Sequence, residues 1–119
     1  MAITGVAIAD PIIWDRIIYI GTDHVWTCRR VTVDGVPIIP SAIKAQIRNK
    51  PYGVLWSELQ AEIDPIEGWM TFTLLKEDTT DPDWRGRKTG TWDVEVVYGD
   101  TTLRWVEGTI TVSQEVTLS

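Results

Sequence analysis

The chain reads GTWDVEVVYGDTTLRWVEGTITV over residues 90–112, and this stretch decides the fold class. From Trp92 to Tyr98 every second side chain is large and apolar, which is the two-residue period of a β-strand with one buried face. Gly99-Asp100 is a turn signal, and residues 103–112 return with a second strand pattern. The stretch therefore predicts a β-hairpin.

Similar patterns occupy most of the chain on the N-terminal side of this hairpin. Residues 25–33 are rich in β-branched and aromatic side chains and end at the turn dipeptide Asp34-Gly35. Alternation predicts two further strands, over residues 43–48 and 69–75, and a short strand is expected near residues 55–59. Residues 76–90 lack apolar alternation, so we expect a loop or one helical turn there.

Several short strands without an amphipathic helix indicate an all-β fold. We expect a single domain over residues 1–119, an antiparallel β-sandwich, Ig-like or small barrel-like, with about seven to eight strands and one irregular loop around residues 76–90. Residues 1–20 have two interpretations. They form an edge strand, or they form an arm that pairs with a neighbouring subunit by strand addition.

Composition excludes several classes of function. The 119 residues carry 11 Lys and Arg against 17 Asp and Glu, a net charge of −6, so nucleic acid is not an expected partner. No stretch approaches the roughly 20 apolar residues of a membrane-spanning helix, and no membrane partner is expected. Cys28 and His24 are the one cysteine and the one histidine, which excludes both an intramolecular disulfide and a Cys/His zinc site.

Catalytic motifs are not found in the sequence. His24 and Cys28 would lie roughly 13 Å apart on an extended strand, too far for a nucleophile and its base. The acidic residues 77, 78, 81 and 83 suggest either a solvated loop or a weak cation site, and their spacing does not match an EF-hand. We therefore predict no enzymatic activity, no cofactor and no metal.

The seven tryptophans are the unusual feature of the composition. Trp26 and Trp92 lie inside patterned strands, where core packing is expected. Trp14, Trp56 and Trp84 lie in the N-terminal arm or near turns, and they are our candidates for interface residues.

Two basic residues complete the set of interface candidates, Arg85 and Arg87. They directly follow the acidic stretch in the segment that contains Trp84. An electrostatic contact with another protein and ion pairing within the loop are both open interpretations.

The strand motifs also carry a resemblance, which covers roughly residues 25–117. The C-terminal third combines an aromatic-Asp-aliphatic-Glu strand, a turn and a strand that ends in Glu-Val-Thr (residues 90–96, 99–100, 103–112 and 115–117), and residues 31–37 and 42–48 match more loosely. This pattern of strand and turn motifs resembles that of small tail or baseplate-associated proteins of phages and prophages. It is also similar to the N-terminal β-sandwich domain of the baseplate upper proteins of lactococcal phages.

The resemblance implies a non-enzymatic virion structural protein, a tail or baseplate adaptor or assembly module. Its partners would be other virion tail proteins and further copies of itself, and it would be synthesised in the bacterial host cytoplasm before joining the virion. The family supplies no catalytic residues. The alternative from a different class is a carbohydrate-binding β-sandwich, in which two or three exposed tryptophans stack on the sugar.

Overall fold

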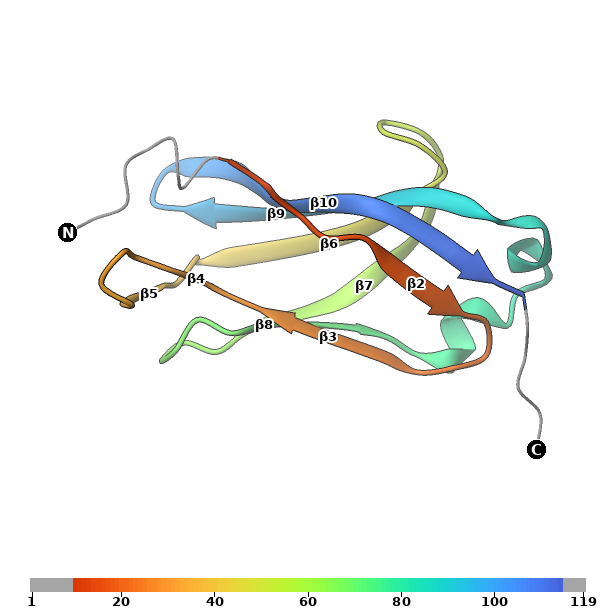
Figure 1. The fold of residues 1–119 in the computed structure, drawn as a ribbon, viewed down its shortest axis with the longest axis horizontal. Helices are drawn as coiled ribbons and strands as arrows, with labels where there is room; N and C mark the ends of the chain where they lie inside the picture. Colours follow the sequence, from red (N-terminus) through yellow and green to blue (C-terminus); the bar gives the residue numbers. More distant parts are fainter. Residues whose placement is uncertain (1–9, 115–119) are drawn as a thin grey trace.

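A computed structural model describes residues 10–114 of the chain (Figure 1). Strands dominate this part, together with two short 3-10 helices. In chain order the elements are β1 (Ile12–Ile13), β2 (Arg16–Tyr19), β3 (His24–Cys28), β4 (Arg30–Val31), β5 (Pro37–Ile38), β6 (Ala42–Arg48), β7 (Leu55–Ile63), β8 (Met70–Leu74), η1 (Lys76–Thr79), η2 (Pro82–Gly86), β9 (Thr89–Tyr98) and β10 (Thr101–Ser113).

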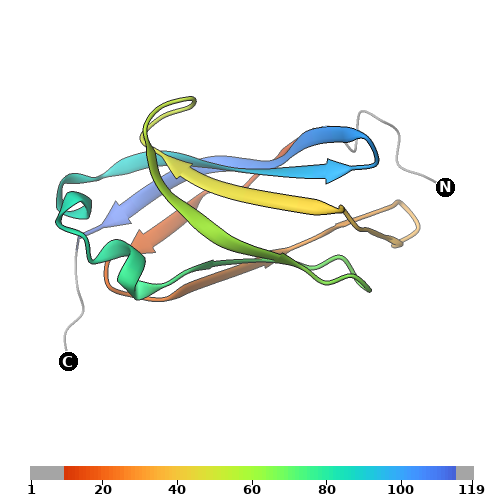
Figure 2. The same ribbon diagram turned by 180° about the vertical axis from the view of Figure 1, so that it is seen from behind.

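Eight strands form one curled sheet in the order β1-β10-β9-β6-β7-β8-β3, and β2 also pairs with β10. The long strand β7 makes the corner. Its first half, up to Leu59, pairs with β6, whereas Gln60 to Ile63 pair with β8. β7 thus passes from one layer of the molecule to the other, as its diagonal course in Figure 2 shows. The expected all-β, barrel-like fold is confirmed.

The strand details differ from the sequence predictions in three ways. β1 and β2 run parallel to β10, so the sheet is not wholly antiparallel. Residues 25–33 do not form one strand, because the chain leaves the main sheet at Arg29 and β4 pairs with β5 in a separate two-stranded sheet. The expected short strand near residues 55–59 continues to Ile63, because β7 serves both layers.

The core lies between the two layers, and the two-residue period places its members. Met70, Phe72 and Leu74 of β8 are fully buried, and so are Ala45 and Ile47 of β6. β9, which pairs with β6 in the same layer, buries three alternate residues, Trp92, Val94 and Val96. Each of these alternations was visible in the sequence, and each is confirmed.

Trp92 is the centre of this core. Its ring centroid lies 5.3 Å from that of Trp26, 5.6 Å from that of Phe72 and 5.8 Å from that of Trp14. The indole Nε1–H of Trp92 donates a hydrogen bond of 2.7 Å to the carbonyl oxygen of Trp14. Contacts of this type contribute about 0.5–1.5 kcal/mol each beyond area burial, so the four rings hold both layers and the N-terminal segment together.

The N-terminal segment packs along β10 of its own chain. Trp14 N–H donates to the carbonyl oxygen of Glu107 at 2.8 Å, and Thr109 N–H donates to Asp15 Oδ1 at 2.8 Å. A Cβ on Gly108 would lie 2.2 Å from the carbonyl oxygen of Trp14, so only glycine permits this approach. Residues 12–19 are therefore edge strands in this fold, and residues 1–9 lie outside the described part.

The segment 76–90, expected as a loop or one helical turn, contains the two 3-10 helices, and its last two residues belong to β9. Its acidic residues cap backbone amides. Asp78 Oδ2 accepts from Leu75 N–H and Asp81 Oδ1 accepts from Asp83 N–H, both at 2.9 Å. Within residues 10–114 no group of three or more His, Cys, Asp or Glu side chains is placed to hold a metal ion. Turn capping thus accounts for the two aspartates at positions 78 and 81.

Candidate functional site

Three of the predicted interface residues meet at one end of the core. The rings of Trp56 and Trp84 contact edge to face with centroids 5.8 Å apart. The guanidinium of Arg87 lies 4.5 Å from the Trp84 ring centroid and 4.9 Å from that of Trp56. Gln114 Nε2 donates to the carbonyl oxygens of Trp84 and Arg87. We call Trp56, Trp84 and Arg87 the end cluster.

Trp84 is only 2% exposed, so the prediction that it is an accessible contact residue is wrong. The physical reason is the η2 turn, which directs the indole inward onto Trp56, 28 positions earlier in the chain. A single strand pattern carries no signal for such a contact. Arg87 is half-buried over the two rings, whereas Arg85 is exposed.

The other tryptophans do not form a flat exposed platform. Trp14 is half-buried against Trp92, and Trp69, at 40% exposed, is the most exposed of the seven. Trp105 and its neighbour Val106 are both buried, although adjacent strand residues normally face opposite ways. A bulge between Arg104 and Val106 resolves this, because one extra residue resets the alternation.

β2 and β3 face each other along an open seam of the sheet. Both are edge strands, and Figure 1 shows them close together at their connecting turn and diverging away from it. At the narrow end Tyr19 N–H donates to His24 Nε2 at 3.0 Å, and the two rings stack with centroids 6.2 Å apart. Further along, the guanidinium of Arg16 lies 4.7 Å from the Trp14 ring centroid and 5.3 Å from that of Trp26. The outer surface of this seam is apolar, with exposed side chains at Ile17, Tyr19 and Val25.

Two titratable groups on β3 are shifted by burial. Desolvation lowers the pKa of His24, which keeps its Nε2 available as a hydrogen-bond acceptor. Desolvation also raises the pKa of Cys28 to about 11, so its thiol is protonated at neutral pH. The two residues occupy opposite ends of β3 and form no nucleophile–base pair.

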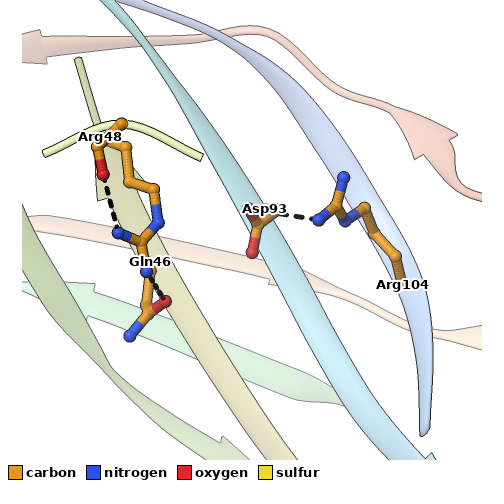
Figure 3. Close-up of polar contacts among 5 residues, drawn as sticks. Gln46, Arg48, Asp93 and Arg104 are labelled. Atoms are coloured by element: carbon orange, nitrogen blue, oxygen red, sulfur yellow. Dashed lines mark hydrogen bonds and ion pairs between the residues drawn. The ribbon is translucent and has the colours of Figure 1, made fainter. Parts of the chain in front are cut away.

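A second surface lies on the outer face of the sheet, where the polar side chains that alternate with the buried residues lie. Side chains from β6, β9 and β10 form the floor of a hollow of about 540 Å³, which we call the trough. Figure 3 shows four of them on neighbouring strands: Gln46, Arg48, Asp93 and Arg104. The N-terminal segment forms one wall, and the β6–β7 turn, residues 49–53, forms the other.

Polar contacts hold the floor of the trough in place. Arg48 donates to Gln46 Oε1 at 2.7 Å and to the carbonyl oxygen of Gly53 at 3.0 Å. Arg104 pairs with Asp93 at 4.0 Å between Nη2 and Oδ2. Burial raises the pKa of Asp93, and the nearby Arg104 partly offsets that effect. The floor thus presents both donors and acceptors in a partly desolvated setting.

Tyr52 stands on the rim of the trough and is 88% exposed. Its φ of 60° lies in the left-handed region, in a turn closed by a 2.9 Å bond from Gly53 N–H to the carbonyl oxygen of Lys50. Pro51 precedes Tyr52, and glycine or asparagine is usual at the position that Tyr52 occupies. This turn lies between the strands predicted over residues 43–48 and near residues 55–59, and no sequence pattern marked Tyr52 as a surface feature.

No protein-family model and no curated protein sequence matches the chain. Over residues 10–114, no helix is long and apolar enough to cross a membrane.

Proposed function

We propose that this chain is a non-enzymatic structural module of a phage or prophage tail or baseplate, which binds other virion proteins and further copies of itself. The observation that carries the proposal is the open seam, where two edge strands with exposed apolar side chains lie beside each other. Such a surface suits an extended segment of a partner chain, which pairs with one edge by strand addition.

On the β3 side, the seam lacks the lysine and proline residues that normally protect an edge strand. Natural edges carry lysine or proline, or they are very short. β3 has the sequence HVWTC, with neither lysine nor proline, and its second residue, Val25, is exposed. The charge on β2 is Arg16, whose guanidinium packs on Trp14 and Trp26. An incoming strand therefore meets an unguarded backbone edge flanked by apolar side chains.

The assignment to a virion rests on the resemblance of residues 25–117 to tail and baseplate-associated proteins. It places the module in the tail or baseplate after synthesis in the host cytoplasm. The non-enzymatic part is supported by the protonated state of Cys28 and by the separation of Cys28 and His24 along β3. Carbohydrate binding by stacked tryptophans has less support, because Trp69 is the only tryptophan that reaches 40% exposure.

The test places a charge on the edge and measures association. Val25→Lys introduces an edge lysine on β3, and Thr111→Lys is the matched control on β10, whose two edges are already paired with β2 and β9. Light scattering after size-exclusion chromatography should show oligomers or partner complexes for the parent chain and for Thr111→Lys. The Val25→Lys variant should lose these oligomers and complexes.

Immunodetection in tail particles from a culture of the bacterium that carries the gene provides the second measurement. The expected result is that the chain is present in the particles. A strict monomer that is also missing from the particles would refute the proposed function.

A further inference from the structure

We propose that the trough is a binding site for a neutral saccharide, with Tyr52 stacking on the sugar ring while the floor hydrogen-bonds its hydroxyl groups. This site uses the outer face of β6, β9 and β10, whereas the seam is formed by the edges of β2 and β3, and it does not depend on the proposed assembly function. It also differs from a tryptophan platform, because the aromatic residue is a tyrosine on the β6–β7 turn.

The shape of the trough suits a small ligand. Its volume of about 540 Å³ falls within the range of about 300–1,000 Å³ that is usual for ligand sites. The floor residues belong to three hydrogen-bonded strands and not to a loop. Sites built on strands hold their geometry better than sites built on loops.

The chemistry of the lining matches hydroxyl groups, each of which donates and accepts a hydrogen bond. Carboxylates at Asp93, Glu95 and Glu107 accept, the guanidinium groups of Arg48 and Arg104 donate, and threonine hydroxyls and the amide of Gln46 do both. The partial burial of Asp93 strengthens such bonds, because the local dielectric is lower than that of water.

The charge of the lining separates the classes of ligand. Four carboxylates, including Asp15 on the wall, outnumber two guanidinium groups, which disfavours phosphates and acidic sugars. A basic peptide would have to compete for these carboxylates with Arg104, which already pairs with Asp93 at the floor, and with the nearby Arg48. A neutral ligand with many hydroxyl groups meets neither penalty.

Tyr52 provides the apolar contact that a sugar ring needs on its C–H face. Its backbone lies in the left-handed region, which is strained for a non-glycine residue, and such strain often occurs at functional sites. The turn is fixed by Pro51, and Asn49 Oδ1 accepts from Val54 N–H at 2.7 Å. The backbone at Tyr52 therefore loses little conformational freedom when a ligand binds, which favours affinity.

The experiment titrates the full chain with neutral oligosaccharides of glucose, N-acetylglucosamine and rhamnose, followed by calorimetry and by amide chemical shifts. A polygalacturonate and a lysine-rich peptide are included as charged probes. Tyr52→Gly relieves the backbone strain and should keep or raise stability while weakening binding by about tenfold or more. Asp93→Asn keeps the shape of the floor and should also weaken binding.

Trp69→Ala is the control, because Trp69 is exposed and does not line the trough. It should bind like the parent chain, and the shifted amides should map to β6, β9 and β10. Three results would overturn the inference: no neutral oligosaccharide binds, binding survives Tyr52→Gly but not Trp69→Ala, or only the lysine-rich peptide binds. Association measured with Val25→Lys reports on the seam separately, so the two proposals fail independently.

Discussion

Replacing Trp84 by alanine tests whether the segment 76–90 seals the end of the core. The side chain is 2% exposed and contacts both Trp56 and Arg87. Truncation of a buried tryptophan removes its burial energy and leaves a cavity, and the usual cost is about 3–5 kcal/mol. Domains of this size have total stabilities of about 5–15 kcal/mol. We therefore expect Trp84→Ala to lower the melting temperature by roughly 12–20 °C, at about 4 °C per kcal/mol.

Urea denaturation followed by far-UV circular dichroism measures this loss without depending on tryptophan fluorescence. Trp69→Ala is the matched control, because Trp69 is 40% exposed and leaves a smaller cavity. We expect about 1–2 kcal/mol for that variant. If Trp84→Ala unfolds cooperatively within about 1 kcal/mol of the parent chain, Trp84 is not a core residue and the end cluster does not close the sandwich.

Three further predictions concern the N-terminal segment and β3. Gly108→Ala should destabilise the fold by about 2 kcal/mol or more and expose residues 10–20 to protease, because the new Cβ would lie 2.2 Å from the Trp14 carbonyl oxygen. The control Gly86→Ala has open space around the new Cβ and should change neither stability nor protease sensitivity. With a pKa of about 11, only about one Cys28 thiol in a thousand is ionised at pH 8, so a disulfide reagent should modify the folded chain far more slowly than the urea-unfolded chain, and equal rates would contradict the assigned burial. Because the pKa of His24 lies below its ordinary value of 6.5, the unfolded chain takes up the proton first. The stability linked to His24 should be fully present above about pH 6.5 and be lost as pH falls through the folded pKa. Melting curves from pH 8 to pH 5 should show this slope in the parent chain and a reduced slope in His24→Gln.

Alternation predicted the core members of β6, β8 and β9, because one buried face imposes a period of two on each strand. It did not predict the parallel pairing of the N-terminal segment with β10, since partners that far apart leave no local signal. The bulge at Arg104 and Val106 was also missed, and with it the joint burial of Trp105 and Val106. Periodicity reports which way a residue faces, whereas a bulge changes that direction without changing the composition.

The trough and the end cluster were likewise predictable from the sequence only in part. The polar halves of β6, β9 and β10 were visible as alternation, but their register is needed to place Gln46, Asp93 and Arg104 in one hollow. Trp56 and Trp84 were selected for their positions near turns and Arg87 because it follows the acidic stretch, and the three residues do meet. Their role as a packed unit follows from the η2 turn, which no sequence pattern specified.

The pairing of the N-terminal segment with β10 also sets an order of events during synthesis. Asp15 and Thr109, which form one of these hydrogen bonds, are 94 positions apart. β1 and β2 are synthesised before β10 and therefore lack this partner until β10 has been made. Through that interval Ile12, Ile13 and Ile17 lack the β10 backbone beside them. The pairing of β1 and β2 is completed only by β10, so a chain that stops before β10 leaves these apolar strands unpaired.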